Sequence, residues 1–399
     1  MIQILSESAQ LALDTILLKP TQGIPCWMVH LMNHSHIERL AGANPGDYRR
    51  DPEKVYLAAQ RLIGVCSLDQ FIADNPLTMG DSGYDESVGL PPPANDYIPY
   101  NPVVMDSAAS HAATTGSGQI ILNEMLIDSP EATVEHLERF VFPQIEKDIA
   151  EFDEDRRVRE ILAEEQRVQD IFGPDILKTG FNFIYFPYFY YGVYGYENYF
   201  MAYGLYPEVT EKHFALQADY ALLNNRAAAR AYQEGNLPPL HRLDFDMADG
   251  RGTLVNIKSL DRIWLPHFAR CLEPMLNTGV RMIWHCDGNL MAMVPRLLDV
   301  GIKGFQGFQY EFGMDYEKIC AMKTKDGEDL VILGGVSVSV TLPFGTPADV
   351  KRQIDWLVEK GPRTGLFLGA SSTVTPEVSW ENVKTLVEGV QYYRRHGRR

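Results

Sequence analysis

Short apolar runs alternate with longer stretches of helical periodicity along most of the chain. The runs have the length of buried strands and the stretches between them have the length of crossover helices, which is typical of a parallel sheet. The candidate strands are residues 24–29, 66–72, 176–182, 240–246, 281–287, 304–309, 330–336 and 366–371. Eight such units in 399 residues favour a (β/α)8 TIM barrel, an α/β fold, over an open doubly wound sheet.

The interval between the second and third candidate strands is far longer than a crossover requires. We therefore expect a single barrel domain over residues 1–399, with an elaborated N-terminal half and an insertion or lid over approximately residues 80–172. Residues 80–118 are rich in Gly, Pro, Ser and Asn and are typical of a loop. Residues 129–172 have a helical pattern, with Ser129 as the N-cap and Pro130 at the first helical position.

Residues 181–206 are aromatic at more than half of their positions, and neither a strand period nor a helix period explains them. Pro187, Gly192 and Gly195 interrupt the segment. It predicts an aromatic loop over the barrel mouth that covers a flat or weakly polar ligand. Packing on neighbouring helices, or a Tyr-rich oligomer interface such as that of a homodimer, is the alternative.

The amino-acid composition limits the classes of ligand and the cellular compartment that we expect for this protein. The net charge of −17 and the pI near 5.0 provide no basic surface for nucleic acid, so a neutral or cationic small molecule is the expected ligand. The five cysteines are widely spaced and form no CxxC motif, which is typical of a reducing compartment. No apolar run approaches the ~18 residues of a membrane span and the amino terminus does not resemble a signal peptide, so we expect a cytoplasmic protein.

The carboxyl ends of the strands form the catalytic face of a TIM barrel. The fifth candidate strand ends in His285, Cys286 and Asp287, and alternation places His285 and Asp287 on one side of the strand with Cys286 on the other. The pair could bind a divalent ion, or Asp287 could orient the imidazole for acid/base chemistry.

Neighbouring strand ends add carboxylates and amides. Asp244 and Asp246 share one face of the fourth strand, and the sixth is followed by Gln309, Glu311 and Asp315. We predict His285, Asp287 and Asp246 as the catalytic residues. The same three residues, together with Glu311, are the predicted ligands of zinc or another divalent ion.

Other strand ends supply candidate substrate contacts. The first strand is followed by His30, Asn33, His34 and His36, for which substrate contact or a structural role is favoured over metal binding. The predicted substrate-binding residues are His30, Asn33, Asn182, Tyr185, Gln309 and Ser372. The absence of GxGxxG, Walker and GxSxG motifs disfavours nucleotide cofactors and serine hydrolysis.

From about residue 200 onward the chain resembles the uroporphyrinogen decarboxylase superfamily. The resemblance lies in DFDMADGRGTLV, the long segment from LPHFARC to GFQGFQ, GGVSVSVTLPFGTPADV and LFLGASSTVTPEVSWENVKTLVEG, with looser similarity at IPCWM and VCSLDQF. It implies a (β/α)8 barrel and either of two chemistries, cofactor-free decarboxylation or zinc-dependent, corrinoid-linked methyl transfer. The arginine-rich loop of the decarboxylases is replaced here by WMVHLMNHSH, with no arginine before Arg39.

The methyltransferases of the superfamily hold zinc through His-x-Cys on the fifth strand and a Cys after the eighth. His285 matches the first ligand, but Asp287 and Ser372 stand at or near the two Cys positions, so a retained ion would have harder ligands. The resemblance implies methyl transfer from a small methylated or methoxylated compound to a corrinoid carried by a partner protein. A metal-assisted or acid/base decarboxylase of a small acid, and a non-catalytic binder of an aromatic ligand, are the alternatives.

Overall fold

The computed structural model describes residues 5–27, 30–71, 113–114 and 119–398. Six strands form one parallel sheet in the order β13–β12–β11–β10–β7–β6, and β1 pairs with β5 in a second. The bounds are β1 (Ser67–Leu68), β5 (Leu177–Lys178), β6 (Gly180–Phe181), β7 (Leu240–Asp244), β10 (Arg281–His285), β11 (Gly304–Gln306), β12 (Val331–Val336) and β13 (Leu366–Ala370). Each strand lies within one of the predicted runs, and β5 and β6 share the third.

Cys26 closes the ring of strands. It forms parallel bridges with Val65, just before β1, and with Leu368 in β13. The run at 24–29 therefore supplies the remaining barrel position, although residues 28 and 29 lie outside the described residues. The predicted (β/α)8 barrel is confirmed.

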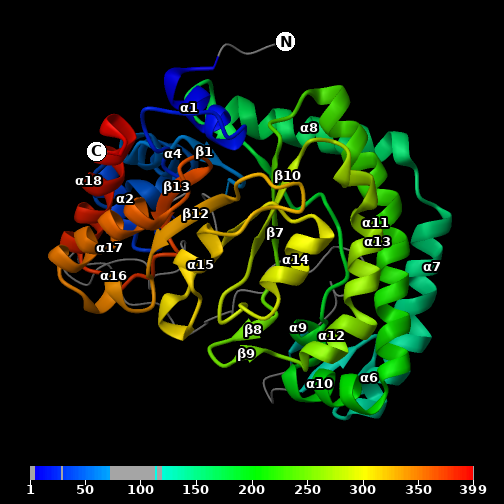
Figure 1. Ribbon diagram of the computed structural model, residues 1–399. Helices are drawn as coiled ribbons and strands as arrows, with labels where there is room; N and C mark the ends of the chain where they lie inside the picture. The colour runs from blue at the N-terminus through cyan, green and yellow to red at the C-terminus, as the bar shows by residue number, and fades with distance from the viewer. Residues whose placement is uncertain (1–4, 28–29, 72–112, 115–118, 399) are drawn as a thin grey trace.

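Helices cover the outside of the barrel (Figure 1). In the first half these are α1 (Glu7–Ile16), α2 (His34–Ala41), α3 (Asp47–Arg50), α4 (Pro52–Ile63), α6 (Pro130–His136), α7 (Phe142–Ala150), α8 (Glu154–Phe172), α9 (Tyr191–Tyr194), α10 (Tyr196–Leu205) and α11 (Pro207–Gly235). In the second half they are α12 (Ile257–Ile263), α13 (Leu265–Leu276), α14 (Val294–Val300), α15 (Tyr316–Cys320), α16 (Thr341–Phe344), α17 (Pro347–Lys360) and α18 (Trp380–His396). Among the described residues, no helix is both long and apolar enough to cross a lipid bilayer.

Two apolar cores follow from strand alternation. The outward-facing side chains pack against the helices, whereas the inward-facing ones fill the barrel with Trp27, Cys66, Leu177, Leu240, Ile283, Val331, Leu333 and Phe367. Ala9, Ala12 and Ile16 of α1 belong to this inner cluster. Helix α1 thus closes the amino end, and the hairpin of β8 (Ala248–Asp249) and β9 (Gly252–Thr253) lies at the opposite end (Figure 1).

The predicted insertion is partly described. Residues 80–112 lie outside the described residues, and a small antiparallel sheet of β2 (Ala113–Thr114), β3 (Ile120–Leu122) and β4 (Met125–Ile127) follows them. The helical pattern at 129–172 is present as α6, a π-helical turn, α7 and α8. Ser129 is the N-cap, and its hydroxyl accepts a hydrogen bond from the backbone N–H of Ala132 at 3.1 Å.

The aromatic segment differs from the expected loop, because residues 191–205 are largely helical in α9 and α10. Most of its rings are packed rather than exposed. The ring centroid of Phe186 lies 5.3 Å from that of Trp284, and that of Phe189 lies 5.1 Å from that of Phe245. Contacts between distant rings, which periodicity in one segment does not reveal, hold it against β7 and β10.

Candidate metal centre

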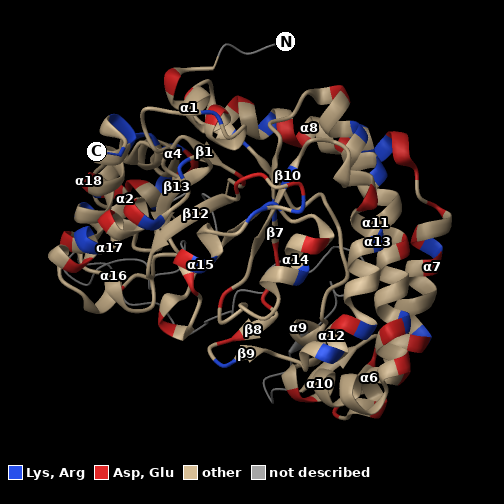
Figure 2. Cartoon of the chain, in the orientation of Figure 1, with Lys and Arg blue, Asp and Glu red and all other residues tan. Residues whose placement is uncertain are grey.

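Strands β7, β10 and β11 align their functional side chains at the carboxyl end of the barrel. His285 is the register partner of Asp244 on one side and of Gln306 on the other. Inward-facing Leu240 and Ile283 fill the barrel below them. The polar residues therefore begin where the apolar filling ends, and acidic residues lie where the chain leaves β7 toward β8 (Figure 2).

Three predicted residues converge at this level. Ligand atoms of Asp246, His285 and Asp287 all lie within 4.8 Å of one another. The backbone N–H of Asp287 donates a hydrogen bond of 2.7 Å to Oδ1 of Asp246, which ties the two strand ends together. Two carboxylates and one imidazole at these separations are a donor set suited to a divalent cation.

Asp287 lies between the cluster and the end of β13. The hydroxyl of Ser372 donates to Oδ2 of Asp287 at 3.4 Å, whereas Oδ1 is buried with no hydrogen-bond partner in the described part of the chain. Burial raises the pKa of Asp287 to about 6, and Asp246 and Asp244 raise it against the opposing effect of His285. The pKa of Asp246 is also raised. Desolvation and the charge of Asp244 raise it by more than His285 lowers it, even though Asp246 keeps contact with solvent.

His285 is buried, and its Nε2 lies 3.8 Å from Oδ1 of Asp244. Burial alone would lower the pKa of the imidazole, but Asp244 and Asp287 outweigh this effect and raise it. The Nδ1 atom is buried with no hydrogen-bond partner among the described residues. Cys286 points away from the cluster, as alternation predicts, and its thiol donates to the carbonyl of Asp287 at 3.0 Å.

Arg242 is a site residue that the sequence analysis missed. Its buried guanidinium donates to Asp69, which follows β1, and to Asp244 on its own strand. The same guanidinium lies over the ring of Phe181, 4.4 Å from the centroid. Strand alternation from Asp244 and Asp246 would have placed Arg242 on the inner face, but no local signal identifies Asp69 as its partner.

Two glutamines stabilise the strand ends. The backbone N–H of Gly288 donates to Oε1 of Gln309 at 2.8 Å, so the predicted residue Gln309 supports the turn that follows Asp287. Gln306, which the sequence analysis did not select, donates through Nε2 to the carbonyl of Ser371 at 3.0 Å. Its buried Oε1 has no hydrogen-bond partner within the described ranges.

The histidines after the first strand have separate roles. His30 is buried beside Thr373, with Nδ1 at 3.4 Å from the hydroxyl, and burial together with Arg242 lowers its pKa to about 4. Asn33 caps α2 by accepting from the N–H of His36, and its amide donates to the carbonyl of Pro376. Because α2 begins at His34, His30 and His34 do not share a helix face.

Three predicted residues lie outside the cluster. Glu311, expected as a metal ligand, is exposed in a 3-10 turn and accepts from Ser337 at 3.2 Å, and it is not among the three residues whose ligand atoms converge in the described part of the chain. The hydroxyl of Tyr185 accepts from Arg157 on α8 at 3.1 Å, so this side chain faces the helical layer instead of the mouth. Asn182 is exposed just after β6 in a left-handed conformation, with φ of 62°.

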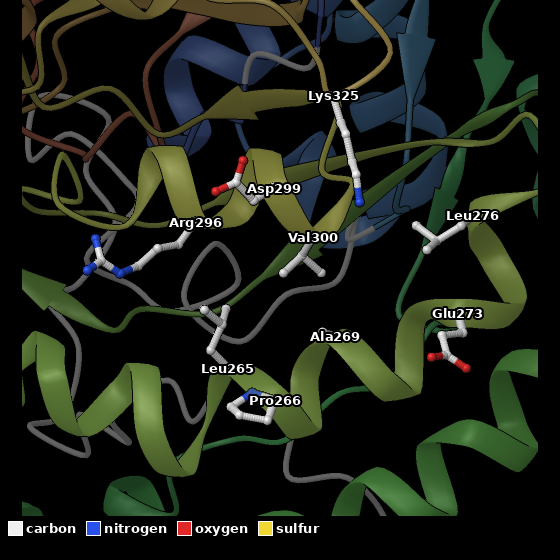
Figure 3. A pocket seen from close by; sticks show the side chains of 9 residues that line it. All are labelled: Leu265, Pro266, Ala269, Glu273, Leu276, Arg296, Asp299, Val300 and Lys325. Atoms are coloured by element: carbon white, nitrogen blue, oxygen red, sulfur yellow. The ribbon is translucent and has the colours of Figure 1, made fainter.

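One residue of the aromatic segment reaches the cluster. The hydroxyl of Tyr191 donates to the backbone carbonyl of Asp246 at 2.9 Å, and its ring lies against Tyr196 and Phe200. A pocket of about 400 Å³ lies elsewhere, between α13 and α14, and includes Leu265 and Arg296 (Figure 3). Because it contains none of the strand-end residues, we place the functional site at the barrel mouth.

Comparisons with known proteins agree with this architecture. The family model of uroporphyrinogen decarboxylase (URO-D) matches residues 245–393, which confirms the resemblance expected from the sequence. A methyltransferase from Methanosarcina mazei has a similar structure, with a TM-score of 0.57 and 15% identity over 97% of this chain and 98% of that chain. At this identity the likeness establishes the fold alone. A search of curated proteins finds no significant match.

Two further structural matches are weaker. A B12-independent methionine synthase from Shewanella sp. W3-18-1 is 13% identical, with a TM-score of 0.33 over 47% of this chain and 56% of that chain. A putative B12-independent methionine synthase from Listeria monocytogenes is also 13% identical, with a TM-score of 0.36 over 58% of this chain and 68% of that chain. Similarities at this level carry no argument about function.

Proposed function

Because residues 245–393 match the uroporphyrinogen decarboxylase family, we propose that this protein is a methyltransferase of that superfamily. In this proposal it moves a methyl group between a small methylated or methoxylated compound and a corrinoid carried by a partner protein. The observation that carries it is the cluster of Asp246, His285 and Asp287 at the carboxyl ends of β7 and β10. In the methyltransferase branch, two of the zinc ligands lie on the fifth strand, which corresponds to β10, and the third follows the eighth.

The residues fit a divalent metal ion. Asp246, His285 and Asp287 would hold it, and the buried Oδ1 of Asp287, which has no partner among the described atoms, is a free ligand oxygen. Zinc remains the first candidate, but two carboxylates make the donor set harder than the thiolate-containing set of the methyltransferase branch. A bound ion would act as a Lewis acid that polarises the oxygen or nitrogen from which the methyl group departs.

The remaining residues bind, orient and exclude water. Asp244 lies beside Nε2 of His285 and orients the imidazole, while Gln309 stabilises the turn at Gly288. Phe186 packs against Trp284 on β10, and Phe189 packs against Phe245 just after β7. This aromatic packing excludes water from the outer face of the sheet. Tyr191 places an aromatic ring beside Asp246, at the entrance that an apolar methyl donor would use.

Exposed apolar side chains support a protein partner. Several exposed large apolar side chains lie on segments that follow the barrel strands, and such side chains are enriched where proteins associate. They are Tyr196, Met201, Leu205, Phe312, Val340 and Phe344. A partner that delivers a corrinoid to the site would cover those of these side chains that lie nearest to it.

A metal-assisted or acid/base decarboxylase is the second candidate. The raised pKa of His285 favours it, since a raised pKa stabilises the protonated form of an imidazole that could deliver a proton to a carbanion. The test is methyl transfer from methoxylated compounds to cob(I)alamin, followed through the absorption change on methylation. Methylcobalamin formation that His285→Ala abolishes supports the proposal. Release of CO2 from a small acid with no methylcobalamin formed would favour the decarboxylase.

A further inference from the structure

Several buried polar atoms at the inner wall of the barrel have no hydrogen-bond partner within the described residues. They are Nη2 of Arg242, Nε2 of His30, Oε1 of Gln306 and Oγ1 of Thr179. All four residues are more than nine-tenths buried. Leaving such groups unsatisfied destabilises the fold, so they identify a place where a ligand or ordered water supplies the missing partners.

Three of these atoms, those of Arg242, His30 and Gln306, belong to one region beside the proposed metal centre. Arg242 lies one inward position below Asp244 on β7, and Gln306 is the register partner of His285. His30 contacts Thr373 and Gln306 contacts Ser371, so both residues are attached to the segment that follows β13. The pKa of His30 is lowered by burial and, to a smaller extent, by the charge of Arg242.

The charges of the side chains around this region determine whether a charged or an uncharged ligand can bind there. Asp69 and Asp244 pair with the guanidinium of Arg242, and the carboxylates of Asp246 and Asp287 lie in the adjoining cluster with His285. Even a bound divalent cation would leave an excess of negative charge, and His30 adds no positive charge because its pKa is about 4. Since Arg242 is already paired with two carboxylates, a third anion would be repelled.

We infer that Arg242, His30 and Gln306 form a subsite for an uncharged group of the substrate that both accepts and donates hydrogen bonds, such as an amide or a hydroxyl. An oxygen of that group accepts from Nη2 of Arg242, and an N–H or O–H donates to Oε1 of Gln306. The inference deepens the proposed function by excluding carboxylates from the end of the substrate that enters the barrel. It rests on that function only for the identity of the reaction.

The experiment compares two nearly isosteric probes, 4-methoxybenzamide and 4-methoxybenzoate, by isothermal titration calorimetry with the purified protein. The amide should bind at least about tenfold more tightly than the carboxylate, because only the latter adds a negative charge. Replacing Asp244 by Asn should strengthen benzoate binding and narrow the difference. Equal or tighter binding of benzoate by the native protein, or no binding of the amide, would overturn the inference.

Gln306→Leu tests the hydrogen bond itself. It should weaken 4-methoxybenzamide binding about tenfold, since the amide N–H of the probe loses its acceptor. Gln166→Leu, on the exposed face of α8, is the matched control and should leave the affinity unchanged. Unchanged amide affinity in Gln306→Leu would refute the subsite. Because binding is measured without a corrinoid, failure of methyl transfer alone would refute the proposed function and leave the subsite intact.

Discussion

The hydroxyl of Ser372 lies 3.4 Å from Oδ2 of Asp287, although 85 positions separate the two residues. The ends of β10 and β13 therefore meet at the site, at or near the positions for which the resemblance to zinc-dependent methyltransferases implies cysteines. Asp287→Cys combined with Ser372→Cys should raise zinc affinity about tenfold or more, because thiolates are softer ligands that zinc prefers. Competition with a chromogenic chelator measures the affinity. Each single variant is the control, and a double variant no better than either single one would show that the side chains cannot ligate together.

His285→Ala should remove the bound metal and reduce turnover at least ~100-fold, because it deletes the only imidazole of the cluster. Elemental analysis of the purified protein measures the metal, and circular dichroism verifies the fold. His396→Ala, near the end of α18, is a control that should retain full metal content. Turnover at the native level in His285→Ala would remove this residue from the mechanism.

The metal-free protein should be destabilised at high pH by Asp287. Its folded-state pKa of about 6 exceeds the ~3.9 of an unfolded Asp, so the penalty is absent below pH ~4 and grows as pH rises through 6. Asp287→Asn should therefore raise the free energy of unfolding by about 1–2 kcal/mol at pH 8 and have little effect near pH 4. Urea unfolding with a chelator present measures both values.

Asp299→Asn, on the exposed side of α14, provides the comparison for that experiment and should change stability little at either pH. An equal gain from Asp287→Asn at both pH values would indicate that the effect does not arise from ionisation of this carboxyl.

Arg242 should be essential for stability because it pairs with two carboxylates inside the barrel. Arg242→Met should lower the free energy of unfolding by about 3 kcal/mol, since it leaves the buried carboxylate of Asp69 without its cation. Adding Asp69→Asn should recover part of this loss. A double-mutant cycle by urea unfolding measures the coupling, and additive effects would contradict a direct pair.

The sequence predicted the barrel well and the site only in part. All eight strands were recognisable because buried parallel strands are short apolar runs, and Asp246, His285 and Asp287 followed from alternation at strand ends. Asp69 and Gln306 were missed because their significance lies in contacts between distant segments. Periodicity also could not show that Tyr185 faces α8 or that Glu311 pairs with Ser337.

Gly307 should control the position of His285. It follows β11 with φ of 87°, and a Cβ atom there would lie 2.7 Å from Nδ1 of His285 and 2.9 Å from the carbonyl oxygen of Cys286. Gly307→Ala should therefore displace the imidazole and weaken metal binding about tenfold or more, beyond the ~1 kcal/mol that a left-handed Ala costs. Gly327→Ala is the control variant. Gly327 has a similar φ of 81°, but a Cβ atom added there would meet no described atom within 4 Å. Comparing metal affinity and urea unfolding of the two variants separates backbone strain from displacement of His285. If both variants lose stability equally and keep native metal affinity, the close approach of Gly307 to His285 has no role in shaping the site.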